Sequence, residues 1–118
     1  MIRVLVIDDS VAFLTAATEV VLAAEGFELA GVARSGEEGL ELARLRRPDL
    51  ALIDLNMPGI DGRETAARMA AESPETISLL MTATPDPTGQ SDGLLDKRVL
   101  SPAALANIWE QTQTPSVR

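Results

Sequence analysis

The chain has 118 residues, of which 46% are hydrophobic and only 3% aromatic, so it fits one ordinary domain with a core of Val, Leu, Ile and Ala. A formal net charge of −8 leaves no basic stripe to displace counterions from phosphates, which argues against direct nucleic-acid binding. The apolar runs are too short to span a bilayer, and the amino terminus enters a strand at once with no secretory signal, so we expect a cytoplasmic protein that does not bind membranes.

Apolar runs and amphipathic stretches alternate along the chain. Short apolar runs bounded by polar residues are typical of buried strands, and apolar residues at helical spacing behind a capping residue are typical of helices. The predicted strands cover residues 2–7, 28–33, 50–55 and 76–82. The predicted helices cover residues 11–25, 36–47, 63–72 and 102–111, and they begin after Ser10, Ser35, Gly62 and Ser101. Residues 1–111 are predicted to form the domain, and 112–118 a polar tail or the start of a linker.

Strands separated by helices predict right-handed crossovers and a parallel sheet with helices on both faces. Asp8 and Asp9 directly follow the first predicted strand, and Asp54 lies at the end of the third. The carboxyl ends of parallel strands meet at one edge of the sheet, where ligands gather, so these three acids should lie together. Crowded carboxylates resist ionising together, and the cluster therefore predicts a divalent cation or a basic neighbour. We expect the functional site there.

Further residues complete a recognisable set. The three acids, the turn at 57–62, Thr82-Ala83 after the fourth strand and Lys97 before the last helix occur in an order that resembles a bacterial two-component response-regulator receiver domain. The resemblance covers nearly the whole chain. It implies a flavodoxin-like, doubly wound five-stranded parallel sheet with strand order 2-1-3-4-5. In the turn, we expect Gly59 and Gly62 to adopt backbone angles that other residues avoid.

The resemblance also implies a chemical role for the acids. Asp54 would be the nucleophile that accepts a phosphoryl group from a phosphohistidine on a sensor histidine kinase or phosphotransfer protein. Asp9, Asp54 and the backbone carbonyl of Asn56 would bind Mg²⁺ directly, and Asp8 would bind it through water. Such a mixed oxygen set suits magnesium, which retains waters. No turnover of an external substrate is expected, so the domain would be a signalling module rather than an enzyme.

Three more residues receive roles by the same resemblance. Lys97 would supply the fixed positive charge, while the Thr82 hydroxyl and the Ala83 backbone amide would donate hydrogen bonds to the phosphoryl oxygens. Taken alone, Thr82 is an ordinary strand residue and Lys97 an ordinary solvated lysine. Their place in the set is what favours the functional interpretation.

The sequence departs from the family pattern in one region. Residues 84–93 contain two prolines and two glycines, which predicts that the fourth helix of a receiver is missing or shortened to a turn. Leu94 stands where many receivers have a switch aromatic, and Arg98 stands where a proline usually follows the lysine. We therefore expect phosphorylation to persist while signalling uses another surface, for example a mobile 84–93 segment that orders when Thr82 engages the phosphoryl group.

Other functions were weighed against this one. A pseudo-receiver, a binding module that never takes phosphate, is the main alternative because Arg98 and the altered segment could misplace Lys97. A haloacid-dehalogenase-like phosphatase would need an acid two residues after its nucleophile, where Asn56 stands, and an amide cannot shuttle the proton. A flavin carrier would need a hydroxyl-rich phosphate loop after the first strand and aromatic residues around the flavin ring, and Asp8-Asp9 in an almost aromatic-free chain argue against both. The partner kinase, the oligomeric state and the presence of an output domain after the tail stay open.

Overall fold

The computed structural model describes residues 1–84 and 94–113. The strands are β1 (Ile2–Ile7), β2 (Phe27–Ala33), β3 (Leu50–Asp54), β4 (Ile77–Thr82) and β5 (Leu95–Asp96). The helices are α1 (Val11–Ala23), α2 (Gly36–Arg46), α3 (Gly62–Glu72) and α4 (Pro102–Gln113), and a 3₁₀ turn, η1 (Lys97–Val99), follows β5 directly. No helix within the two described ranges is long and apolar enough to cross a membrane.

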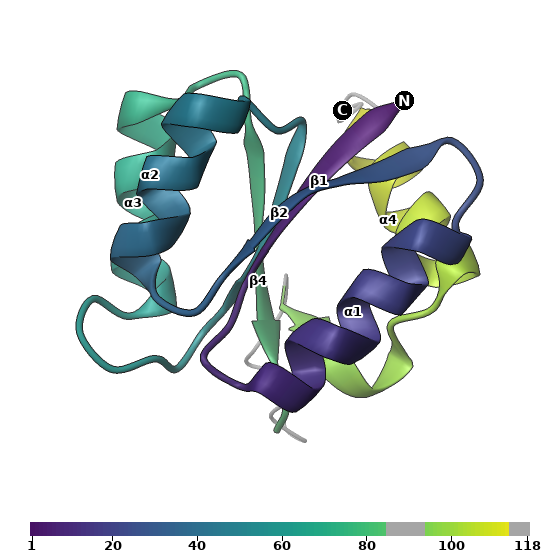
Figure 1. Ribbon diagram of the computed structural model, residues 1–118, viewed down its shortest axis with the longest axis horizontal. Coiled ribbons are helices and arrows are strands. Elements are labelled where there is room, and N and C mark those ends of the chain that lie inside the picture. Colours follow the sequence, from purple (N-terminus) through teal and green to yellow (C-terminus); the bar gives the residue numbers. More distant parts are fainter. Residues whose placement is uncertain (85–93, 114–118) are drawn as a thin grey trace, which may run out of the picture.

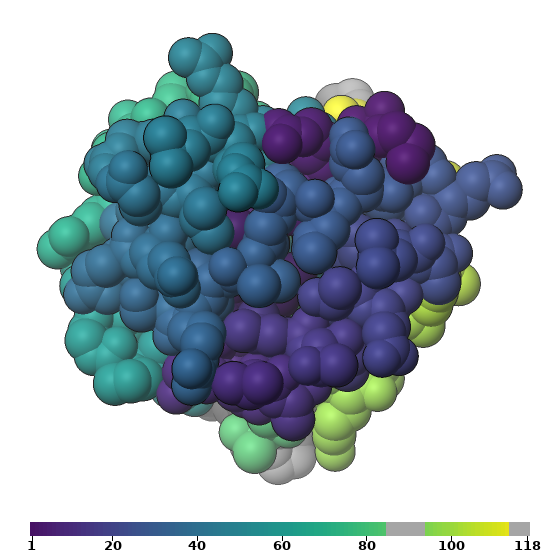
Figure 2. All heavy atoms as spheres, viewed as in Figure 1, coloured from purple at the N-terminus to yellow at the C-terminus, as the bar shows by residue number. Residues whose placement is uncertain are grey.

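All five strands are parallel and lie in the order β2-β1-β3-β4-β5, which confirms the predicted flavodoxin-like topology. Helices α2 and α3 cover one face of the sheet, and α1 and α4 cover the other (Figure 1). In the space-filling view, side chains occupy the space that separates these two layers in the ribbon (Figure 2). The fold is therefore a three-layer sandwich of helices, sheet and helices. The amino ends and the carboxyl ends of the strands lie at its two open sides.

The central strands explain why the apolar runs are continuous rather than alternating. Every residue of β3 is buried, as are the last four residues of β1, because helices cover both faces of these strands. The buried side chains form two apolar clusters, one on each side of the sheet. The cluster under α1 and α4 includes Leu14, Val21 and Leu105, and the cluster under α2 and α3 includes Leu40 and Met69.

Capping residues fix where the helices begin. The Ser10 Oγ accepts a hydrogen bond from the Phe13 amide at 3.2 Å, and the Ser35 Oγ accepts one from the Glu38 amide at 3.1 Å. These caps satisfy amides that have no partner within their own helix. Because Ser10 is the cap, α1 begins immediately after Asp8 and Asp9 and keeps both acids at the edge of the sheet.

Element ends differ from the sequence predictions by one or two residues. Helix α1 ends at Ala23 rather than Glu25, and α4 continues to Gln113 rather than ending near Gln111. Such shifts are ordinary where helix ends fray. The division into a domain, 1–111, and a tail, 112–118, stays a prediction. The predicted loss of a fourth helix concerns residues 85–93, which lie outside the described part of the chain.

Candidate functional site

The carboxyl ends of β1 and β3 bring three acids together, as the strand pattern predicted. Strands β1 and β3 are neighbours in the sheet, so Asp8 and Asp9 after the first lie beside Asp54 at the end of the second. One carboxylate oxygen from each residue lies within 4.8 Å of the others. Asp8 is fully buried and Asp54 is 6% exposed, whereas Asp9 faces solvent. The cluster thus has a buried floor and an open side.

The two carboxylate oxygens of Asp8 have different environments. Oδ1 accepts a hydrogen bond from the Ser10 amide at 2.8 Å. Oδ2 is buried and has no hydrogen-bond partner among the described residues. It lies 2.5 Å from the Nζ of Lys97, so the two groups form an ion pair that lacks hydrogen-bond geometry. A buried charged oxygen without a hydrogen bond is costly unless a cation satisfies it.

Lys97 is the only lysine of the chain, and the fold carries it into the acid cluster. It begins η1 directly after β5, and its side chain is only 11% exposed. Besides Asp8, the ammonium lies 3.5 Å from Asp54 Oδ1, to which it donates a hydrogen bond. The Lys97 ammonium therefore lies against the acids rather than in solvent. Its functional role stays a prediction, and so does the choice between a phosphoacceptor and a pseudo-receiver.

The electrostatics of Asp54 show that one ammonium does not neutralise the cluster. Burial raises the pKa of the Asp54 carboxyl, and the neighbouring Asp8 raises it further. Lys97 opposes both effects through its charge and its hydrogen bond, yet the pKa stays above the ordinary value for aspartate. The negative charge of the site is therefore only partly compensated by the protein.

The donor set fits a magnesium ion. It consists of carboxylate oxygens with an open side for water ligands, which is the environment that Mg²⁺ prefers. Three carboxylates share the single Lys97 ammonium, and this excess of negative charge is the specific observation that supports a cation here. Asn56 lies two residues after Asp54 on the exposed loop that follows β3. Its role as a metal ligand stays a prediction.

Thr82 and Ala83 lie at the same edge of the sheet. Thr82 is the last residue of β4, is 3% exposed and pairs with Asp96, the residue before Lys97. Its Oγ1 accepts a hydrogen bond from the Thr84 amide at 3.2 Å. The Thr82 hydroxyl acts as an acceptor in that contact, and it donates no hydrogen bond to another of the described residues. Ala83 is exposed just beyond the strand.

Sequence reasoning misjudged one glycine at the site. Gly59 has a φ of +79°, as expected for a turn glycine, but Gly62 has no positive φ and is the first residue of α3. A Cβ on Gly62 would lie 2.3 Å from the backbone oxygen of Asp54 and 2.7 Å from the Cα of Leu55. Gly62 is therefore required by the close approach of α3 to the end of β3, and not by its backbone angles.

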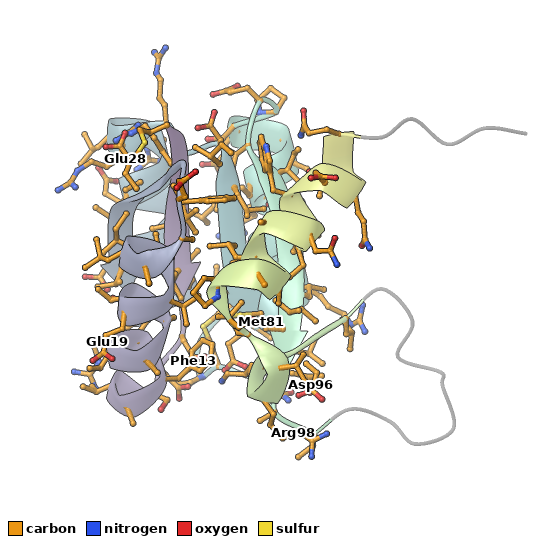
Figure 3. The ribbon with its side chains drawn as sticks, turned by 90° about the vertical axis from the view of Figure 1, so that its right-hand side faces the viewer. Phe13, Glu19, Glu28, Met81, Asp96 and Arg98 are labelled. Carbon is orange, nitrogen blue, oxygen red and sulfur yellow. The ribbon has the colours of Figure 1, made fainter. Side chains whose placement is uncertain are left out.

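Sequence reasoning also missed Phe13. Its ring, in the first turn of α1, lies with its centroid 4.4 Å from the Lys97 Nζ. Figure 3 shows Phe13 at the same end of the molecule as Asp96 and Arg98, which flank that lysine in sequence. An available signal was the scarcity of aromatic residues, since the chain has two phenylalanines, one tryptophan and no tyrosine.

Comparison with known proteins gives this arrangement a family. The family model described as "Response regulator receiver domain" matches residues 4–94. The chain belongs to the response regulator receiver domain family. It is 48% identical over 84 residues to protein-glutamate methylesterase/protein-glutamine glutaminase 2 of Anaeromyxobacter dehalogenans, an alignment that covers 71% of this chain and 24% of that protein. It is 38% identical over 82 residues to the response regulator GacA of Pseudomonas aeruginosa, covering 70% of this chain and 38% of GacA.

Solved structures agree on the fold of this receiver domain. The signal receiver domain of the putative response regulator NarL from Mycobacterium tuberculosis superimposes with a TM-score of 0.77 at 28% identity, covering 92% of this chain and 96% of that one. The response regulator domain of Thermotoga maritima CheB gives a TM-score of 0.78 at 21% identity over 98% of this chain and 99% of that one. The chain spans between about a quarter and two-fifths of the length of the curated relatives named above. It thus corresponds to the signalling module within longer regulators.

Proposed function

We propose that this receiver domain is a phosphoacceptor in two-component signalling, with Asp54 as the residue that is modified. The observation that carries the proposal is the Lys97 ammonium within 3.5 Å of Asp54 and 2.5 Å of Asp8, in a cluster of three strand-end carboxylates. Asp54 is only 6% exposed, but it borders the open side formed by Asp9. A phosphoryl group can therefore reach its carboxylate from solvent while the rest of the site stays fixed.

The proposed step is a phosphoryl transfer. A carboxylate oxygen of Asp54 forms a bond to phosphorus as the bond from phosphorus to the imidazole nitrogen of a phosphohistidine breaks. A carboxylate suffices as nucleophile because this reaction depends mainly on positioning and on charge neutralisation. The histidine would belong to a sensor histidine kinase or a phosphotransfer protein, which is the partner class that the receiver family implies.

The resemblance to receiver domains implies the roles of the remaining site residues. Asp9, Asp54 and the Asn56 carbonyl would hold Mg²⁺ directly and Asp8 would hold it through water; the ion, when bound, supplies positive charge against the incoming phosphoryl oxygens. Lys97 supplies a second positive charge from the protein side.

The end of β4 would complete the phosphoryl site. The Thr82 hydroxyl and the Ala83 amide would donate hydrogen bonds to the phosphoryl oxygens. The position of Thr82 at this edge supports that role, as does its hydroxyl, which donates no hydrogen bond among the described residues. The small Ala83 side chain leaves room for the anion.

The setting of the domain follows from its relatives. They are considerably longer than this chain, and whether an output domain follows residue 118 stays open. We propose that the receiver acts by switching its interactions with partner proteins rather than by turning over a substrate itself. Its cytoplasmic location, expected from the sequence, is part of the same proposal.

A direct test is incubation with acetyl phosphate and Mg²⁺ followed by intact-mass measurement. We expect the mass of one added phosphoryl group, lost when Asp54→Asn is used and when Mg²⁺ is removed by chelation. Asp61→Asn is the matched control, because Asp61 lies near the site but caps α3 through the Glu64 amide at 2.8 Å, and Asn caps equally well. An unmodified wild-type chain under conditions that modify a known receiver would favour the pseudo-receiver, a module that binds partners without phosphorylation.

A further inference from the structure

The single lysine of the chain is held from three directions. Its ammonium faces Asp8 at 2.5 Å, Asp54 at 3.5 Å and the Phe13 ring centroid at 4.4 Å. These residues come from the ends of β1 and β3 and from the first turn of α1. The two carboxylates attract the ammonium, and the ring is the aromatic contact found for it among the described residues. We propose that Phe13 is a positioning residue that keeps the Lys97 ammonium over the acid cluster, an inference that rests on the proposed function.

A ring face is suited to this task. The π-system carries negative potential on its face and attracts a cation within about 6 Å of the centroid, most strongly when the cation is desolvated. The Lys97 side chain is 11% exposed, so its ammonium has lost most of its water. The ring adds attraction without adding a hydrogen-bond acceptor or a formal charge to a site that is already too negative. Phe13 thus confines the lysine without competing with the phosphoryl group for its protons.

The backbone around Lys97 does not provide the same restraint by itself. The turn is closed by Asp96, whose Oδ1 accepts hydrogen bonds from the Arg98 amide at 2.9 Å and from its Nε at 3.1 Å. The Arg98 side chain is 67% exposed, and an exposed pair of this kind holds its partners weakly. The Asp96–Arg98 pair orients η1, but it leaves the four-carbon side chain of Lys97 to be positioned by other contacts. Phe13 acts together with Asp8 and Asp54 to direct the end of that side chain.

Phe13 has a second role that the test must separate. It is half-buried and packs against the apolar cluster beneath α1 and α4, so replacing it also changes packing. Phe27 offers a matched comparison, because it belongs to the same cluster and is the only other phenylalanine. Phe13→Leu and Phe27→Leu make the same chemical change, but only the first removes the ring from Lys97. Phe13→Tyr keeps an aromatic face and serves as the rescue variant.

The first readout is the NMR signal of Lys97, measured on the whole chain labelled with ¹³C,¹⁵N-lysine and without Mg²⁺. One lysine gives one set of side-chain signals, so no assignment is needed. We expect the ring current to displace the ε-CH₂ protons upfield in wild type, Phe13→Tyr and Phe27→Leu, and this displacement to disappear in Phe13→Leu. Identical Lys97 signals in wild type and Phe13→Leu would overturn the proposal.

The second readout is the rate of Asp54 modification by acetyl phosphate and Mg²⁺. Loss of a cation–π contact to a largely desolvated ammonium predicts a rate lower by about three- to thirtyfold in Phe13→Leu, recovered in Phe13→Tyr. If Phe13→Leu is slowed no more than Phe27→Leu, the positioning role is wrong although the phosphoacceptor function stands. If wild type itself is never modified, the proposed function fails, and the NMR comparison still decides whether Phe13 holds Lys97.

Discussion

The close approach of α3 to the end of β3 makes Gly62→Ala the most informative substitution near the site. The added Cβ would lie 2.3 Å from the Asp54 oxygen, more than 1 Å short of the 3.4 Å at which ordinary contact begins. The obstructing atoms belong to the backbone and cannot rotate away. The Leu55 amide is bound to the Met81 oxygen at 2.8 Å, and the Gly62 amide to the Leu55 oxygen at 3.0 Å. The start of α3 must therefore move, and the second of these bonds must lengthen.

Two opposing effects set how much Gly62→Ala changes the free energy of unfolding. Overpacking of this kind costs about 1–3 kcal/mol, and the upper end applies because backbone atoms are involved. Alanine favours a helix over glycine by about 1 kcal/mol, which offsets part of this cost. We expect the free energy of unfolding of Gly62→Ala to be lower than that of wild type by roughly 2 kcal/mol. Displacement of the Asp54 backbone should also slow modification by acetyl phosphate.

The loss of stability in Gly62→Ala can be measured by urea unfolding, followed by the fluorescence of Trp109, the only tryptophan of the chain. Gly31→Ala in β2 is the control, because a Cβ there would make only ordinary contacts, the nearest at 3.4 Å to Leu42 Cδ1. We expect the control to lie within about 0.5 kcal/mol of wild type. Equal stability of the two variants would refute the argument that close backbone approach, and not conformational freedom, requires glycine at position 62.

Two further predictions follow from local strain and from charge. Arg47, the C-cap residue that follows α2, lies in the left-handed region with a φ of 47°. Arg47→Gly should therefore raise the free energy of unfolding by up to about 1 kcal/mol in urea titrations, whereas Arg47→Ala should not. No gain in stability for glycine would contradict the strain. Burial and the nearby Asp8 raise the pKa of Asp54, although Lys97 opposes them. The folded state therefore binds a proton at Asp54 more readily than the unfolded state does. Above the folded-state pKa, the ionised carboxylate lowers the stability of the fold. In Mg²⁺-free buffer at neutral pH, the free energy of unfolding of Asp54→Asn should therefore exceed that of wild type. This difference should shrink as the pH falls from the folded-state pKa of Asp54 towards the ordinary value for aspartate. A difference that stays constant across that pH range would exclude the destabilising effect of the ionised carboxylate.

Those parts of the fold that depend on local pattern could be predicted from the sequence. The runs 2–7 and 50–55 are apolar at every position but one each, because strands covered on both faces need no polar side. This pattern identified the central strands. The caps Ser10 and Ser35 were predictable because each satisfies amides only three residues away. The acids at the strand ends followed from the geometry of any parallel sheet.

The contacts that complete the site were decided only by tertiary structure. Lys97 lies 43 residues from Asp54 in sequence, and whether its amine reaches the acids depends on where a two-residue strand and a short turn place its backbone. The ring of Phe13 over that amine and the contact of Gly62 with the β3 backbone likewise join elements that no local pattern relates. Sequence periodicity reports which face of an element is buried. It does not report which atoms from separate elements meet there, because that depends on how whole helices pack against the sheet.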